Sequence, residues 1–186
     1  EYFGIVPTFS NTLQVSGVDL RGNPVAGATA TLEVANPNPS GWPELRINEW
    51  RAAQHALSGP DFVELYNPGA LPVLLGGCHL SDAPYANPLR HRIANLSFIE
   101  ARGFALFAAD GDESAGPGHL NFRLSANGGH LRLSDGAGHE LDGVVYGPQT
   151  PDISEGRSPD GSRRIEFLGA GTPGQPNPVP ATQTRS

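Results

Sequence analysis

The stretch Asp61–Asp82 reads DFVELYNPGALPVLLGGCHLSD, and its pattern predicts a β-hairpin. Later parts of the chain repeat the same kind of pattern. In its first apolar run, Val63 and Leu65 alternate with Phe, Glu and Tyr, which is the two-residue period of a strand. The Pro-Gly pair at 68–69 favours a turn, because proline presets φ and glycine accepts a positive φ. A second apolar run meets Gly-Gly at 76–77, which is typical of a bulge or kink. We therefore expect two antiparallel strands, the second with a corner in it.

Similar short segments, separated by turn residues, follow along the chain. The clearest is 120–146, where apolar and polar residues alternate on three successive strands joined by Gly-rich turns. Residues 103–109 are almost continuously apolar, which predicts a strand buried on both faces at the centre of the fold. Only 51–57 has helical propensity, and it spans barely two turns. About eight strands at roughly ten-residue spacing predict an all-β, two-sheet sandwich with less than about one-tenth helix.

Residues 1–44 differ from the segments that follow. Alternation at 12–18 and 28–34, on either side of a turn-rich stretch, predicts an N-terminal β-hairpin extension. The Pro-rich stretch 36–43 predicts a stiff hinge. A single hairpin is marginal in water, so its strands are either the remnant of a preceding β-domain or an addition to an edge of the sandwich. We predict that the hairpin docks onto the main domain.

The sandwich itself is expected at 45–178. Residues 172–186 are rich in Pro, Thr and Gln, which predicts a linker, and we assign 179–186 to a disordered tail. The chain contains no Met and opens without a signal peptide, so we expect it to be part of a longer protein with neighbouring domains. No apolar run reaches about 18 residues, so no membrane span is expected.

The charge of the chain bears on its binding partners, and its cysteine content bears on disulfide formation. The 186-residue chain has a net charge of −7, and all 12 of its basic residues are Arg, scattered along the sequence. Because nucleic-acid surfaces need a clustered basic patch, we expect no specific nucleic-acid partner. Cys78 stands alone, so no intrachain disulfide is possible, and its apolar flanks predict a small buried residue rather than a reactive thiol.

Six short motifs, in order, resemble the lamin tail domain in its bacterial form: INEW at 47–50, DFVELYNPG at 61–69, LGGCHLSD at 75–82, LNFRLSANGGHLRLSD at 120–135, GRSPDG at 156–161 and TPGQPN at 172–177. The resemblance covers roughly Leu45 to Asn177. It implies an immunoglobulin-like β-sandwich without a shared catalytic motif. Bacterial members commonly sit as accessory modules in large exported or surface proteins, so the resemblance also implies an extracellular or cell-surface location.

Motifs for catalysis and for transition metals are missing from the sequence. There is no His-Glu-x-x-His, Cys-x-x-Cys or Gly-x-Ser-x-Gly. Asp110, Asp112 and Glu113 are candidate ligands of Ca²⁺, because alternate carboxylates across a glycine can present several oxygens to a hard cation. Ser and Ala at 114–115 break the calcium-loop pattern, so we favour a solvated loop and expect no cofactor. Turn chemistry accounts for four further acids: Asp135, Asp142, Asp152 and Asp160.

Glu64 is a carboxylate inside a strand and needs a separate account. The structural hypothesis pairs it across the sheet with Arg46 or Arg92, since buried charges are normally paired. A catalytic hypothesis needs a second carboxylate, for which Glu49 is the candidate, so that the two divide acid and base roles. We favour the structural role.

The function expected is therefore a non-catalytic binding or structural module that recognises a protein or surface ligand through loops or a strand edge. The alternative is a carbohydrate-binding accessory domain of a hydrolase. Such pockets use exposed aromatic rings, and the sequence offers Trp42, Trp50 and four Tyr. The third hypothesis, an enzyme in its own right, lacks a recognisable set of catalytic residues.

Overall fold

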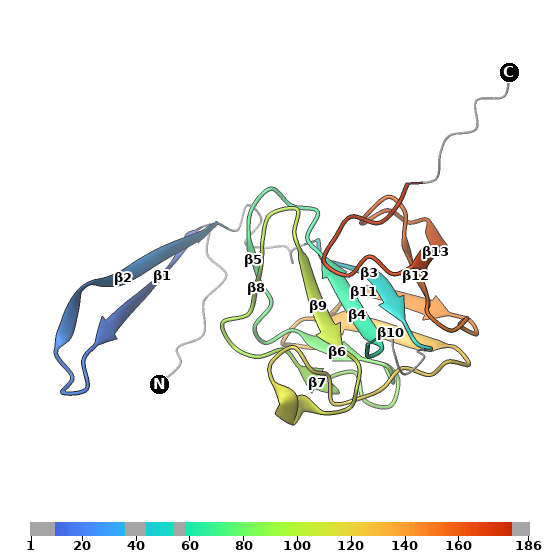
Figure 1. The fold of residues 1–186 in the computed structure, drawn as a ribbon, viewed down its shortest axis with the longest axis horizontal. Helices are drawn as coiled ribbons and strands as arrows, with labels where there is room; N and C mark the ends of the chain where they lie inside the picture. Colours follow the sequence, from blue (N-terminus) through green and yellow to red (C-terminus); the bar gives the residue numbers. More distant parts are fainter. Residues whose placement is uncertain (1–9, 36–43, 54–58, 180–186) are drawn as a thin grey trace, which may run out of the picture.

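The computed structural model describes residues 10–35, 44–53 and 59–179, and it confirms an all-β protein (Figure 1). In these ranges the helical content is one 3-10 turn, Glu113–Ala115. Of the predicted helical stretch 51–57, Arg51 ends a strand and residues 54–58 lie outside the described residues. No helix among the described residues is long and apolar enough to cross a bilayer.

Four antiparallel sheets contain all the strands of the described residues. The largest has the order β13-β12-β3-β4-β9, with bounds β13 Ile165–Ala170, β12 Ile153–Arg157, β3 Arg46–Arg51, β4 Phe62–Tyr66 and β9 Phe104–Ala108. The second has the order β11-β10-β6-β7, with bounds β11 Glu140–Tyr146, β10 Gly129–Ser134, β6 His79–Ser81 and β7 His91–Arg92. Two small sheets pair β5 (Val73–Leu74) with β8 (Phe98–Ile99), and β1 (Ser10–Val18) with β2 (Pro24–Ala35).

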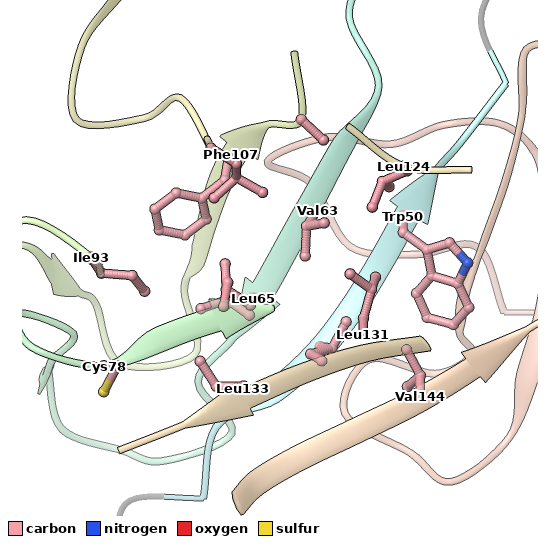
Figure 2. Close-up of a cluster of buried hydrophobic side chains, with 14 of the residues drawn as sticks. Trp50, Val63, Leu65, Cys78, Ile93, Phe107, Leu124, Leu131, Leu133 and Val144 are labelled. Atoms are coloured by element: carbon pink, nitrogen blue, oxygen red, sulfur yellow. The ribbon is translucent and has the colours of Figure 1, made fainter. Parts of the chain in front are cut away.

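The five-stranded and four-stranded sheets share one apolar core, which gives a sandwich-like arrangement (Figure 2). Trp50 and Leu65 enter it from the larger sheet, and Leu131 and Leu133 enter it from β10; all four side chains are 0% exposed. Cys78 is also buried, as expected, and burial raises the pKa of its thiol to about 11. An ionised thiolate is therefore disfavoured at neutral pH.

The hairpin predicted from Asp61–Asp82 is wrong in its pairing. β4 does alternate as expected, but it pairs with β3 and β9, while β5 pairs with β8. Asn67 explains the change of direction: its side-chain Nδ2 donates to the carbonyls of Leu71 and Glu100 at 2.8 Å each, and its Oδ1 accepts the backbone N–H of Gly69 at 2.9 Å. The turn is present, but it sends the chain into the small sheet.

Two other strand predictions also need correction. Residues 120–124 keep their buried alternation, yet in the described structure they form one isolated bridge, Arg123 with Asp110, instead of a strand. β10 pairs with β6 on the side where this strand was expected. β9 was predicted at the centre of the fold, but it is an edge strand of the five-stranded sheet, with Leu106 47% exposed. Apolar composition alone did not distinguish a central strand from a partly covered edge.

The N-terminal hairpin forms as predicted, but it does not add to either sheet of the sandwich. β1 and β2 pair with each other from Ser10↔Ala35 to Val18↔Pro24 and form a sheet of their own (Figure 1). Addition of the hairpin to an edge of the sandwich is therefore wrong, whereas its docking onto the main domain stays a prediction. The predicted hinge at 36–43 lies outside the described residues.

Candidate functional site

The acidic loop after β9 borders a shallow depression of about 370 Å³, lined by His91, Arg92, Ala94, Glu113, Gly116, Pro117 and His119. His119 Nδ1 lies 2.6 Å from Asp110 Oδ2. Because a carboxylate accepts hydrogen bonds, the imidazole donates its Nδ1–H to Asp110, which fixes the orientation of the ring. Hydrogen bonds from His119 and from the Asp112 backbone N–H lower the pKa of Asp110, although burial opposes them as the largest single influence.

The three candidate calcium ligands do not converge. Asp110 accepts from His119, Asp112 accepts from the Ser114 hydroxyl, and Glu113 Oε2 lies 3.8 Å from His91 Nδ1. Within the described part of the chain, no group of three His, Cys, Asp or Glu side chains is placed to hold a metal ion. Burial lowers the pKa of His91, whose Nδ1 accepts the Asn121 backbone N–H at 3.3 Å, so this ring is neutral at pH 7. The depression therefore offers hydrogen-bonding groups, without a nucleophile beside the oriented imidazole.

A second polar cluster lies on the outer face of the five-stranded sheet, beneath a segment that we call the C-terminal strap, residues 171–178. Glu49 accepts hydrogen bonds from the Thr172 backbone N–H at 2.9 Å and from its hydroxyl at 3.1 Å. Glu64 accepts from the Gly174 backbone N–H at 2.6 Å. Asn177 is only 3% exposed. The prediction of a linker is therefore wrong for 172–178, because residues of this segment donate hydrogen bonds to buried carboxylates of the sheet.

Asn48 joins this cluster to the turn after β12. Its Nδ2 donates to Asp160 at 2.9 Å and to Glu64 at 3.3 Å, and its Oδ1 accepts the Gly161 backbone N–H at 3.0 Å. Asp160 also accepts the Asn177 backbone N–H at 3.0 Å. One asparagine on β3 thus links β4, the turn and the strap.

The predicted cationic partners of Glu64 are wrong. Arg46 donates to the Leu45 carbonyl and Arg92 donates to the Asn95 side chain. The catalytic hypothesis placed Glu49 beside Glu64, and the two are indeed cross-strand neighbours. Both are 0% exposed under the strap, so a substrate could reach them only if the strap moved.

The side chain of Arg157 connects the two large sheets, and the sequence analysis did not predict this connection. From β12 it donates to both oxygens of Asp142 on β11 at 2.9 and 3.1 Å, to the Ile47 carbonyl at 2.8 Å and to the Ser162 carbonyl at 2.7 Å. Asp142 in turn accepts the Ile47 backbone N–H at 2.8 Å. The turn explanation is therefore wrong for Asp142 and for Asp160, whose donors are Asn48 and Asn177. Asp135 follows it by accepting the backbone N–H two residues on.

Gly156 is required where the backbone of β12 approaches this cluster. A Cβ at this position would lie 2.6 Å from the Asn48 carbonyl oxygen and 3.1 Å from Asn177 Nδ2. We expect Gly156→Ala to lower the free energy of unfolding by about 1–3 kcal/mol, because the backbone must shift to relieve overpacking. Urea unfolding measures the change. Gly147→Ala is the matched control, because no atom lies within 4 Å of its added Cβ, and an equal loss in both variants would contradict the expectation.

Exposed apolar side chains gather in two further places. The β1–β2 hairpin exposes five of them: Val15 58%, Val18 60%, Leu20 108%, Val25 46% and Leu32 39%. In the loop between β6 and β7, Tyr85 is 91% exposed and its ring meets His130 of β10 edge-on at 5.4 Å. Val145 of β11, which pairs with His130, is 74% exposed. Trp50 is fully buried, and Trp42 lies outside the described residues.

Comparison of the chain with protein-family models, with curated protein sequences and with solved structures gives no match. The lamin tail resemblance therefore stays a prediction that rests on the six sequence motifs.

Proposed function

We propose that this chain is a non-catalytic, protein-binding module of the lamin tail type, carried by a larger exported or surface protein of a bacterium. An immunoglobulin-like topology for the sandwich belongs to the same proposal. The motif resemblance supports the family, the fold topology and the location. The observation that carries the binding role is the apolar hairpin β1–β2.

The hairpin is amphipathic, and its apolar face is exposed at Val15, while Leu32 borders a depression that Pro72 and Phe98 also line. The register pairs Val15 with Ala30 and Gln14 with Thr31, so Val15, Ala30 and Leu32 share one face while Gln14 and Thr31 lie on the other. Val15 is 58% exposed and Leu32 is 39% exposed. A two-stranded ribbon with exposed apolar side chains, whose outer edges pair with no other described strand, suits a protein partner, which can bury the side chains and extend the strand pairing.

The sandwich suits the role of a rigid base for this ribbon. The acids that a catalytic hypothesis would use, Glu49 and Glu64, accept internal hydrogen bonds under the strap, and Arg157 is bound to Asp142 and two carbonyls. These groups stabilise the fold where they stand. The same arrangement keeps the hairpin available for a partner, because β1 and β2 are not part of either large sheet.

A site-specific photo-cross-linking experiment tests the proposal. The protein carries a photoreactive phenylalanine analogue at position 15 and is added to cells of the source organism. Irradiation is expected to cross-link it to a protein of those cells. The same analogue at position 14, on the polar face, is the matched control and is expected to give few. The Val15→Ser variant, without the photoreactive group, should bind the partner identified by cross-linking more weakly than the wild-type protein does. Its melting temperature should not fall, because the core of the sandwich does not include this residue.

The carbohydrate-binding alternative has one specific observation in its favour, the exposed ring of Tyr85 braced by His130. Exposed aromatic rings of this kind can stack on sugars. Glycan-array binding that is lost in Tyr85→Ala and retained in Val15→Ser would select this alternative. Equal cross-linking from positions 14 and 15 would also contradict the protein-binding proposal.

A further inference from the structure

The two carboxyl groups under the C-terminal strap have no cationic partner among the described residues. Glu49 and Glu64 face each other across β3 and β4, and both are 0% exposed. The ion pairs of the described residues involve other acids. The donors to the two glutamates are neutral: the Thr172 and Gly174 backbone N–H groups, the Thr172 hydroxyl and the Asn48 amide. Two adjacent buried negative charges would be strongly unfavourable in this setting.

The hydrogen bonds around Thr172 independently indicate a proton on the pair. Thr172 Oγ1 lies 3.1 Å from Glu49 Oε2 and 2.9 Å from Asn177 Oδ1, and a hydroxyl has one proton to donate. The Asn177 amide cannot be reversed to supply another, because its Nδ2 donates to the Arg157 carbonyl at 2.8 Å and to the Asn48 carbonyl at 3.4 Å. A protonated Glu49 resolves the competition, since it donates to Thr172 while Thr172 donates to Asn177.

The other charged groups near the pair do not replace that proton. Asp160 adds a further negative charge beside Glu64, and Tyr66 on the same face of β4 brings no cation. Arg51, further along this face of β3, lies over the Phe62 ring at 5.2 Å and donates to the carbonyls of the loop before β4. The strap from 171 to 178 contains no charged residue, and the residue of β9 opposite Glu64 is a leucine.

We infer that the Glu49–Glu64 pair holds one proton while the C-terminal strap is seated, and that loss of this proton as the pH rises loosens the strap. The proton belongs to the pair, because neighbouring acids titrate together. The result is a strap that is tightest on the acidic side of neutrality.

The titration of Glu64 sets the pH range. Burial, followed by the smaller effects of Glu49 and Asp160, raises the pKa of Glu64 from 4.5 to about 7, against the hydrogen bonds from Gly174 and Asn48. With the strap open, the carboxyl regains water and a pKa near its ordinary value. The closed state therefore binds the proton more tightly, so its stabilisation is complete below about pH 4.5 and is lost as the pH rises to about 7.

Hydrogen exchange at the Thr172 and Gly174 amides tests this inference, because both N–H groups donate to the carboxyl pair. After correction for intrinsic exchange, their protection in the wild-type protein is expected to fall about a hundredfold between pH 5 and pH 8. Glu64→Gln keeps an uncharged group of the same shape and should make the protection of both amides nearly independent of pH. Glu113→Gln, which changes an exposed carboxyl outside the strap, should retain the wild-type decrease.

The amides of β10 separate strap opening from global unfolding, and their corrected protection should change much less over the same range. The inference is wrong if the strap amides keep constant protection in the wild-type protein, or if the decrease persists in Glu64→Gln. Should that variant fail to fold, carboxyl ¹³C titration of the wild-type protein decides: a midpoint near 7 within the Glu49–Glu64 pair supports the inference, and ordinary midpoints near 4.5 for both glutamates overturn it.

Discussion

Arg157→Met is expected to lower the free energy of unfolding by about 3–5 kcal/mol, one of the two largest effects expected of a single substitution in this protein. The substitution keeps an apolar stem of similar length but removes the guanidinium that joins the two large sheets. Asp142, whose side chain is 12% exposed, then keeps its negative charge without a cationic partner. The carbonyls of Ile47 and Ser162 lose their side-chain donor as well. Guanidinium chloride unfolding followed by circular dichroism measures the loss.

Arg164→Met provides the matched control. Arg164 also pairs with a carboxylate, Glu166, but its side chain is 64% exposed, so solvent screens the pair and the expected change is below about 1 kcal/mol. Adding Asp142→Asn to Arg157→Met should restore part of the lost stability, because the uncompensated charge disappears. Equal losses in the free energy of unfolding for the Arg157 and Arg164 variants would show that the inter-sheet ion pair stabilises the protein no more than an exposed pair does.

Trp50→Ala is expected to destabilise the protein by about 3–5 kcal/mol. Trp50 is 0% exposed and belongs to the core shared by both large sheets, where its ring lies 6.1 Å from that of Tyr146 on β11. Truncation removes apolar burial and leaves a cavity that the rigid sheets can fill only in part. Urea unfolding followed by far-UV circular dichroism is the suitable measurement, since Trp42 would complicate fluorescence.

Tyr85→Ala removes another large ring at a position that is 91% exposed, and its expected effect is within about 0.5 kcal/mol. Trp50→Phe should fall between the two, because it keeps most of the apolar contact. A loss below about 1 kcal/mol for Trp50→Ala would mean that the two sheets do not depend on this contact.

Local patterns in the sequence predicted the class of fold and much of its burial. The two-residue period around Val63 and Leu65 correctly assigned their shared face, and both are 0% exposed. The turn at Asp135 follows from its own side chain, which accepts the Ala137 backbone N–H at 2.7 Å. These features depend on residues within a few positions of one another, so they can be inferred without the fold.

The candidate site was only partly predictable. Glu64 was recognised as an unusual strand carboxylate, but its closest donor is the Gly174 backbone N–H, 110 residues away in sequence. Asp142 was assigned to a turn, although it binds Arg157. No local pattern distinguishes an acid that completes its own turn from one that binds a distant arginine.

The sequence by itself determined that the chain is built of short strands, that Val63 and Leu65 share a face, and that the chain turns at Asp135. The tertiary structure alone decided which strands pair, so β4 joins β3 and β9 instead of β5. It also decided that the strap covers Glu49 and Glu64. The physical reason is that side-chain alternation encodes the exposure of a face, whereas backbone edges and buried carboxylates accept any donor that packing brings within reach.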